Sequence, residues 1–290
     1  MTKLKTVLLS SAIAISASIS MAQTNLPAPF DYEFLTVNPD ELVSTQENMA
    51  TLGKIFESLF SQNWEEMSKL YADNYVQHNP DMNDGKEGVI ELFKNLNYEQ
   101  LVYQPVLQLA EGPYVVAMSK LQFAPDQPML GVVDINFIRE GKSREHWDII
   151  MPVEDAEKFF AVSKESTPHD QSTVDSNKAL VADFVNVVFN QRQHDKAREY
   201  IGETYVQHGE GNDGVEAVIE DAKTRLASVE VDMKRIIGMN DLVLLHSRVT
   251  SEGKEFSRVD IWRVEDKKLT EHWGLMQAVP EEMKHNNGMF

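Results

Sequence analysis

The chain of 290 residues contains no cysteine. This absence excludes a disulfide framework, a lipid anchor attached to cysteine and a thiolate nucleophile. Basic residues are scarce too, since 27 lysines and arginines stand against 46 aspartates and glutamates, for a formal net charge of −19. Nucleic acids and anionic lipids are repelled by such a surface, so we expect neither as a partner.

Several motifs of well-known chemistry are missing as well. The sequence has no glycine-rich phosphate loop and no Gly-x-Ser-x-Gly elbow, so nucleotide binding and covalent acyl chemistry lack a candidate. It also has no His-x-His or His-Glu-x-x-His pattern. We therefore predict no cofactor and no metal, although His208, His246, His272 and Asp260 are of ligand type and leave a metal site as the weaker alternative.

The first residues have the pattern of a secretory signal. Lys3 and Lys5 precede a serine-interrupted apolar stretch at positions 7–19, and Ser20-Met21-Ala22 offers the small residues that signal peptidase needs. The stretch is short for a membrane anchor. We predict a signal peptide at 1–22, a periplasmic or secreted protein, and no membrane contact after cleavage.

A set of mostly polar residues occurs twice, in the same order. A duplicated core would repeat Leu and Val instead, so the repeat points to two related domains that share more than packing. The repeated segments are Tyr75-Val76-Gln77-His78 with Asn83-Asp84-Gly85, Tyr205-Val206-Gln207-His208 with Asn212-Asp213-Gly214, Asp134-Ile135 with Glu145-His146-Trp147, and Asp260-Ile261 with Glu271-His272-Trp273.

The repeat and the proline-rich or polar stretches between the copies divide the chain. Pro27, Pro29 and Pro39 interrupt the residues after the signal, and Pro168 lies in a stretch rich in Ser, Thr and Asp. We predict an extended N-terminal arm at 23–47, a first domain at 48–160, a linker at 161–175 and a second domain at 176–290.

Each copy shows three segments of helical periodicity and then four of period two. Helices followed by an antiparallel sheet make an α+β domain with the helices on one face. Asp84 and Asp213 are placed to cap the third helix of each copy. The expected helices are 49–60, 64–71, 87–96, 180–188, 194–201 and 215–226, and the expected strands are 102–109, 114–123, 131–138, 144–151, 229–237, 242–250, 255–264 and 269–277.

Alternation along two adjacent strands places several polar side chains on one face. Asp134 shares a face with Asn136, and His146 shares one with Asp148. A short turn joins these strands, so Asp134 is expected near His146 or Asp148, inside a concave sheet. Two carboxylates and an imidazole in an apolar pocket shift one another's pKa and suit proton transfer. We predict Asp148, Asp134 and His146 as catalytic.

Other residues are expected to bind the substrate. Alternatives remain for some of them, because the tryptophans also suit a core or an interface, and Tyr-Val-Gln-His also suits a corner in which His78 bonds the Asn-Asp-Gly loop. The copies differ at Asp148, which becomes Gly274, and at Met118, which becomes His246, so we expect the first pocket to be the better acid/base site. The predicted substrate-binding residues are His78, Asn136, Met118, Trp147, His208, His246, Asp260 and His272.

Both copies resemble the SnoaL-like polyketide cyclases of the nuclear transport factor 2 superfamily. The resemblance rests on Tyr-Val-Gln-His, on the helix starts Asp84-Gly85-Lys86-Glu87 and Asp213-Gly214-Val215-Glu216, and on the Asp-Ile and Glu-His-Trp hairpin. It implies two tandem cone-shaped α+β barrels, each with three N-terminal helices packed on a strongly curved mixed sheet around an apolar pocket. It also implies cofactor-independent chemistry with an Asp as acid/base, matched to Asp148 or Asp134, and pairing of the two copies as an internal pseudo-dimer.

Three functions remain open. The first is acid/base chemistry of aldol, isomerase or lyase type on a small apolar or carbonyl-containing molecule. The second is binding of a small hydrophobic ligand without turnover, and the third is an interaction module with vestigial pockets. The superfamily hosts all of these on one fold, so the lining of the pockets decides among them.

Overall fold

A computed structural model describes residues 37–290. The predicted signal peptide and most of the predicted arm lie outside the described residues. Within this part of the chain, no helix has the length and apolar character needed to cross a membrane.

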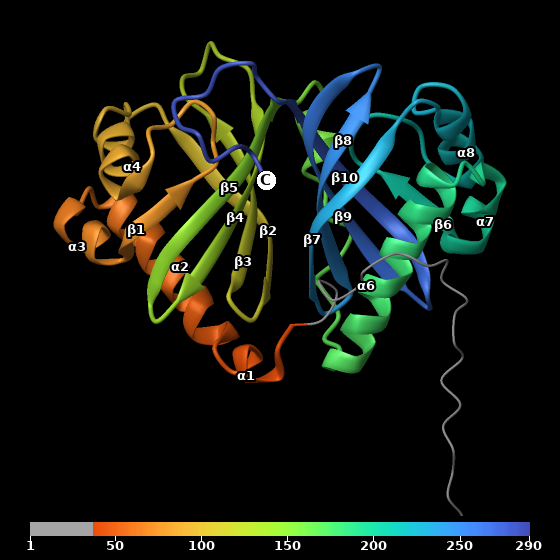
Figure 1. Cartoon of the computed structure of the whole chain (residues 1–290), viewed down its shortest axis with the longest axis horizontal. Coiled ribbons are helices and arrows are strands. Elements are labelled where there is room, and N and C mark those ends of the chain that lie inside the picture. The colour runs from red at the N-terminus through yellow and green to blue at the C-terminus, as the bar shows by residue number, and fades with distance from the viewer. Residues whose placement is uncertain (1–36) are drawn as a thin grey trace, which may run out of the picture. The chain divides into compact units, whose positions relative to one another are not determined.

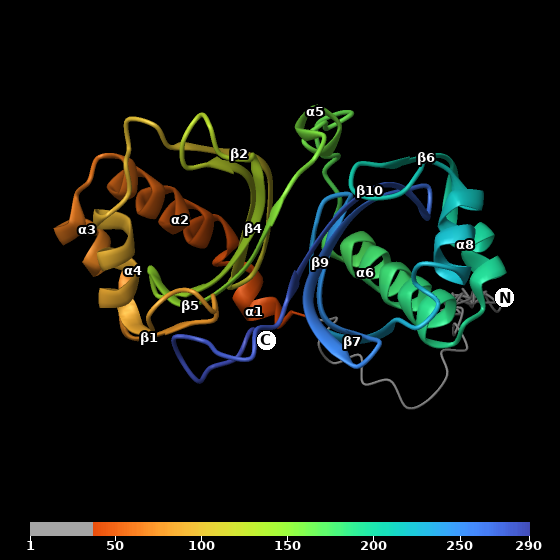
Figure 2. The same ribbon diagram turned by 90° about the horizontal axis from the view of Figure 1, so that it is seen from above.

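The first copy folds as helices packed into a curved five-stranded sheet of order β1-β5-β4-β3-β2. Strand β1 runs parallel to β5 and the other pairs are antiparallel. Helix α2 lies along the concave side of this sheet (Figure 2). The elements are α1 (Pro39–Leu42), α2 (Thr45–Phe60), α3 (Trp64–Lys69), β1 (Tyr71–Gln77), α4 (Gly85–Lys94), β2 (Val102–Glu111), β3 (Tyr114–Gln122), β4 (Leu130–Arg139), β5 (Lys142–Pro152) and α5 (Ala156–Phe159).

The second copy repeats this topology, with the sheet order β6-β10-β9-β8-β7. Helix α6 takes the place of α2 inside the curve of the sheet (Figure 1) and continues into the π-helix η2. The elements are α6 (Gln171–Val185), η2 (Asn186–Asn190), the 3₁₀ helix η3 (His194–Lys196), α7 (Ala197–Tyr200), β6 (Ile201–Gln207), α8 (Val215–Lys223), β7 (Glu230–Met239), β8 (Leu242–Ser251), β9 (Lys254–Glu265) and β10 (Lys268–Ala278). The predicted fold of two tandem cone-shaped α+β domains is confirmed.

The structure corrects several local predictions. The segments Tyr71–Gln77 and Ile201–Gln207 are strands, whereas we expected the end of a helix and a corner. Neither predicted Asp cap bonds its helix; instead, Asp84 Oδ1 accepts from Gln77 N at 2.9 Å, and Asp213 Oδ1 accepts from Gln207 N at 2.8 Å. Each carboxylate therefore holds the last residue of the strand that carries Tyr-Val-Gln, which is β1 in the first copy and β6 in the second.

The predicted arm and linker are also partly helical. Helix α1 and the start of α2 fall within the described end of the arm, where Thr45 Oγ1 accepts from Gly112 N at 2.9 Å. Helix α6 begins at Gln171, inside the predicted linker, because Asp170 Oδ1 caps it by accepting from Thr173 N at 2.8 Å. These residues belong to the packed copies rather than to the connections.

The convex faces of the two sheets pack against each other through one apolar core (Figure 2). Polar contacts at one edge of this core follow a pseudo-twofold pattern. Glu111 Oε2 of the first copy accepts from Gly238 N at 2.8 Å, while Met239 of the second copy lies against Ala110 N. Burial of this surface stabilises the pair of copies by the hydrophobic effect. Buried members of the core include Val116, Met118, Val133, Ile135, Trp147 and Ile149 from one sheet, and Leu244, Val259, Ile261, Trp273 and Leu275 from the other.

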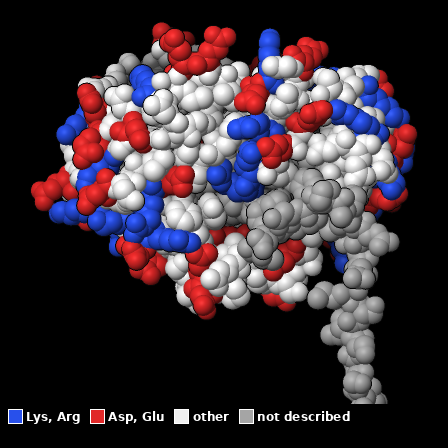
Figure 3. Space-filling model, viewed as in Figure 1, with Lys and Arg blue, Asp and Glu red and all other residues white. Residues whose placement is uncertain are grey.

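Charged side chains of both signs are interspersed over the face shown in Figure 3. The formal net charge of −19 is therefore not gathered into one acidic patch on that face.

Candidate functional sites

The first copy encloses a cavity of about 400 Å³ between its helices and the concave side of its sheet. Most of its wall is apolar, and polar side chains line it from β4, from β5 and from the end of β1 and the residues after it, with Tyr103 of β2 and Gln277 of β10. Four of them were predicted as site residues: Asp134, Asn136, His146 and Asp148. The apolar wall includes Leu52, Ile55, Phe56, Leu59, Val89, Phe93, Leu121, Val132 and Ile150.

Strand register explains why these four side chains meet. Asp134 lies directly opposite Asp148, and Asn136 lies directly opposite His146, in the antiparallel pair of β4 and β5. Alternate residues of a strand share a face, so all four project toward the cavity. The sequence prediction of this arrangement agrees with the observed placement.

His146 is held from both sides. Its Nδ1 lies 3.0 Å from Gln77 Oε1, and its Nε2 lies 3.1 Å from Asp134 Oδ1. The Gln77 oxygen also accepts from the backbone N–H groups of His78 and Asn79, so it is an acceptor and His146 Nδ1 must donate to it. Burial lowers the pKa of His146, but the bond to Asp134 and the charges of both aspartates more than offset this and leave the pKa raised. His146 is therefore held in a fixed orientation beside Asp134, with a raised pKa.

The two aspartates differ in their partners. Asp134 is engaged at both oxygens, by His146 and by the hydroxyl of Tyr103. Asp148 Oδ2 accepts from Asn79 Nδ2 at 2.8 Å, whereas its buried Oδ1 has no partner among the described residues. Burial, together with the negative charge of Asp134, raises the pKa of Asp148 to about 6, although the charge of His146 opposes this. Asp148 is thus a carboxylate with one free oxygen and a pKa close to neutrality.

Asn136 completes the polar wall. It is 5% exposed and lines the cavity, and its side chain makes no hydrogen bond to another described residue. A buried amide without a protein partner is costly unless water or a ligand satisfies it. Its amide nitrogen can donate to an oxygen of a bound molecule.

The same residues carry the features of a metal site. Asp134, His146 and Asp148 each offer a ligand atom, all within 4.8 Å of one another. The donors, however, already bond protein partners: His146 holds Gln77 and Asp134, Asp134 also holds Tyr103, and only one Asp148 oxygen is free. Two carboxylates and one imidazole suit a divalent cation only if these bonds give way.

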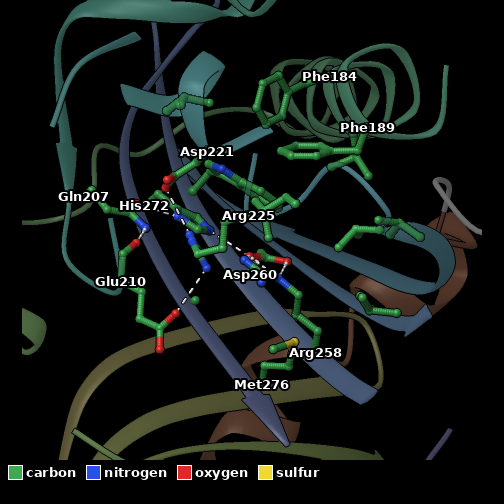
Figure 4. Close-up of a pocket in the computed structure, with 18 of the residues that line it drawn as sticks. Phe184, Phe189, Gln207, Glu210, Asp221, Arg225, Arg258, Asp260, His272 and Met276 are labelled. Atoms are coloured by element: carbon green, nitrogen blue, oxygen red, sulfur yellow. Dashed lines mark hydrogen bonds and ion pairs between the residues drawn. The ribbon is translucent and has the colours of Figure 1, made fainter. Parts of the chain in front are cut away.

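The second copy has a smaller cavity of about 150 Å³ at the corresponding place (Figure 4). Phe184, Phe189 and Trp262 form its aromatic wall, and Asp260 and His272 line it as predicted. Figure 4 shows the aromatic rings of α6 and η2 on one side of the cavity and the charged cluster on the other.

Arg258 changes the chemistry of this cavity. It bonds Asp260 through Nε and Nη2, at 2.6–2.9 Å, and Asp260 also bonds His272 Nε2 at 2.8 Å. Burial raises the pKa of Asp260, but Arg258 and His272 more than offset this, so the carboxyl stays ionised well below its usual range. Burial lowers the pKa of His272, and the bond to Asp260 does not reverse this. The second site is therefore a fixed ion pair of Arg258 and Asp260 beside His272, an imidazole whose pKa is lowered.

The two copies differ at two positions that are in contact with each other in the first copy. Asn79 and Asp148, which bond each other in the first copy, correspond to Gly209 and Gly274 in the second. A side chain at Gly274 would start 3.2 Å from both Asp260 Oδ1 and Arg258 Nη2. Arg258 thus occupies the neighbourhood in which the first copy keeps its free carboxylate.

Five predicted substrate-binding residues do not line either cavity. Met118 lies opposite Val133 and His246 lies opposite Val259, so both point to the convex side, and His246 bonds Ser257 and Arg235 there. Trp147 points the same way because it lies between two cavity-facing neighbours on β5. These predictions are corrected by the face on which the side chains lie.

His78 and His208 also turn away from the cavities. Each stacks on the tryptophan of its own copy's Glu-His-Trp motif, Trp147 at 4.8 Å and Trp273 at 4.4 Å between ring centroids. Their Nδ1 atoms face backbone carbonyls that come from the other copy, those of Gly288 and Lys158. The architectural alternative for Tyr-Val-Gln-His therefore describes these histidines better, although their partner is not the Asn-Asp-Gly loop.

Sequence reasoning missed four residues of the sites: Gln77, Asn79, Tyr103 and Arg258. One of them carried a usable signal, because Asn79 changes to Gly209 at the same time as Asp148 changes to Gly274. Tyr103 lies on an edge strand far from Asp134 in the sequence, and no local pattern links the two.

Comparison with known proteins finds a family model that is similar to part of the second copy. Residues 181–272 match the family of SnoaL-like domains, so the predicted resemblance is confirmed there, and the first copy has the same topology. A comparison with curated proteins gives no match.

Several solved structures are similar in fold. A candidate ketosteroid isomerase from Kribbella flavida is 18% identical, with 45% of this chain and 90% of that chain covered and a TM-score of 0.33. A candidate polyketide cyclase from Streptomyces antibioticus is 17% identical, covers 35% of this chain and 91% of its own, and has a TM-score of 0.31. A nuclear transport factor 2-like protein of unknown function from Mesorhizobium loti is 20% identical, with 38% and 98% covered and a TM-score of 0.34.

Proposed function

We propose that the first copy is a cofactor-independent acid/base catalyst acting on a small, largely apolar carbonyl compound. The observation that carries this proposal is Asp148, a buried carboxyl with a free oxygen and a pKa of about 6 on the wall of an apolar cavity. A general base works best when its pKa lies near the working pH.

The chemistry is abstraction of a proton next to a carbonyl group. The carboxylate of Asp148 takes the proton from carbon, and the electron pair moves onto the carbonyl oxygen to form an enolate. Asn136 Nδ2 donates a hydrogen bond to that developing oxyanion. Return of the proton from Asp148 to the same carbon gives exchange, and its return to another carbon of the enolate gives isomerisation. Where the enolate carbon attacks a second carbonyl group and forms a carbon–carbon bond, the proton goes to the resulting alkoxide, which gives an aldol.

The remaining polar residues position the base. Asn79 fixes one oxygen of Asp148, and His146 is fixed by Gln77 and Asp134 beside it. The positive charge of His146 partly offsets the cost of a second carboxylate next to Asp134. His146 therefore orients and tunes the site, while both of its nitrogens are occupied.

The test is proton exchange at enolisable ketones in D₂O, followed by proton NMR. Asp148→Asn should reduce the exchange rate about 10²- to 10⁴-fold, the range for loss of a general base. Asp260→Asn, a change of the carboxyl group that lines the second cavity, should leave it unchanged. Equal rates for the native protein and Asp148→Asn would overturn the proposal, and loss of native activity on treatment with EDTA would favour the metal site instead.

A second function is proposed for the second cavity: binding of a small carbonyl compound without turnover. The specific observation is Arg258, whose Nη1 has no partner among the described residues while its other nitrogens hold Asp260. A cavity of about 150 Å³ accepts a molecule of roughly benzene size. Acetophenone should perturb the ring signals of Trp262, and Arg258→Met should weaken its binding to the level of toluene; an unchanged affinity would contradict this role.

Two wider proposals concern the whole chain. We propose that it is exported and loses residues 1–22, which N-terminal sequencing of the secreted or periplasmic protein would test by finding Gln23 first. We also propose that the shared convex core makes the two copies an internal pseudo-dimer. A chain that self-associates through these same sheet faces would contradict the latter.

A further inference from the structure

The C-terminal segment 284–290 belongs to the second copy by sequence but bonds the first copy. It follows β10 and runs beside the first copy in both ribbon views (Figures 1 and 2). Four hydrogen bonds join it to the consecutive residues 77–80 of the first copy. The bonds are Lys284 N to Pro80 O at 2.9 Å, His285 Nε2 to Asn79 O at 2.8 Å, Asn287 Nδ2 to Gln77 O at 2.9 Å, and His78 Nδ1 to Gly288 O at 2.9 Å.

Two of these four residues bond the reactive groups of the first cavity. Gln77 orients His146, and Asn79 bonds Asp148. None of the residues of segment 284–290 lines the cavity. The segment therefore contacts the residues that hold the reactive groups and not the reactive groups themselves.

The hydrogen bonds define the state of His285. Asn287 N donates to His285 Nδ1 at 3.3 Å, so the ring proton lies on Nε2, which donates to Asn79 O. The segment therefore holds the backbone of Asn79 by a directed hydrogen bond from one tautomer of His285.

The end of the segment is anchored on the second copy. The ring of Phe290 stacks on His246 at 5.8 Å between centroids, and Arg248 lies 4.5 Å from the same ring. Met289 is only 2% exposed. His246, which the cavities do not use, therefore has a place in this anchor.

The second copy has a corresponding contact without the same consequence. Lys158, in α5 after the last strand of the first copy, faces His208 Nδ1 through its carbonyl at 3.1 Å. The next residue there is Gly209 and the residue facing it is Gly274, so that contact has no carboxylate to position.

We infer that segment 284–290 is a positioning element for the first site: it holds the backbone of residues 77–80 so that Asn79 bonds one oxygen of Asp148 and leaves the other free. The second copy then has a role in the reaction of the first, through its C-terminus. This inference rests on the proposed role of Asp148 for its functional meaning, but its test does not require turnover.

The test follows the titration of the Asp148 carboxyl carbon by NMR in protein labelled with ¹³C-aspartate, assigned with Asp148→Asn. The titratable groups that act on Asp148 are Asp134, His146, Asp81, Tyr75 and Tyr103, and none of them lies on the segment. Asn287→Ala therefore removes no charge from the site, whereas the shortened chain also loses Lys284 and His285, whose ring bonds the carbonyl of Asn79. A shift in the titration would report the bond from Asn79.

Asn287→Ala and a chain ending at Met283 should each raise the Asp148 midpoint by about one unit, because a hydrogen bond that favours the charged form is lost. Asn286→Ala is the matched control, since Asn286 is exposed and makes no side-chain bond within residues 37–290, and it should change nothing. Asn79→Ala should reproduce the shift, and shortening the chain in that background should add none.

An Asp148 midpoint that stays at the native value in folded Asn287→Ala would overturn the inference, even if the melting temperature falls. An additional shift on shortening the Asn79→Ala chain would overturn it too, because the segment would then act by another route. Retention of ketone exchange by Asp148→Asn would instead defeat the proposed function and leave these titrations as they are.

Discussion

At the scale of single residues, the proposed chemistry depends on the raised pKa of one carboxyl group, that of Asp148. The pKa of Asp148 is raised from 3.8 to about 6, so the folded state binds this proton more tightly than the unfolded chain does. Ionisation of Asp148 therefore destabilises the fold, and the cost appears as pH rises from the lower value through the higher one.

Asp148→Asn should relieve that cost. Relative to the native protein, the variant should gain on the order of 3 kcal/mol of unfolding free energy on going from about pH 4 to about pH 8. The change of side chain itself cancels, because only the difference between the two pH values is used. Urea denaturation at both values measures it, and a gain independent of pH would show that burial does not raise the pKa of this group.

The predictability of site residues depended on whether strand periodicity applied to them. Asp134, His146 and Asp148 lie within regular strands, and their shared face could be derived from alternation alone. His78 comes just after a strand, and its partner Gly288 is distant in the sequence, so no local pattern gives its direction.

At the scale of elements, period-two strands and amphipathic helices were predictable, but β1 and β6 were not. Each is seven residues long and pairs parallel to a strand that comes much later in the chain. Its burial does not alternate simply, because two polar residues in its middle are exposed. Strand formation in such a segment is determined by pairing with a strand distant in the sequence, and the segment's own hydrophobic pattern does not predict it.

The contact between α6 and the β2–β3 hairpin depends on a buried ion pair. Lys178 Nζ lies 2.6 Å from Glu111 Oε1, with side chains 0% and 1% exposed, and Glu111 also accepts from Gln171. This pair joins the second copy to the first. Its removal from one side leaves a buried charge without its partner.

Lys178→Met should therefore destabilise the protein by about 3–5 kcal/mol. The double variant Lys178→Met with Glu111→Gln should recover part of that loss, because no uncompensated charge remains. Lys69→Met, in an exposed pair with Glu65, is the control and should have little effect. Chemical denaturation measures all three, and a Lys178→Met protein as stable as the control would contradict the proposed contact.

At the scale of the whole molecule, duplication has produced two cavities of opposite electrostatic character. The first keeps a carboxyl whose pKa is raised and an imidazole whose pKa is raised, whereas the second has an ion-paired carboxyl and an imidazole whose pKa is lowered. The repeated residues that join the copies are His78, His208, Trp147 and Trp273. The two functions proposed above follow from this division, with proton transfer in one copy and binding in the other.

The central claim is that Asp148 is the base, and the pH dependence of ketone exchange by the native protein tests it most directly. The account predicts a rate, kcat/KM, that rises with pH through a midpoint of about 6, coincident with the titration of the Asp148 carboxyl carbon. A rate that does not change across this range, or whose midpoint differs from that of Asp148, would contradict it.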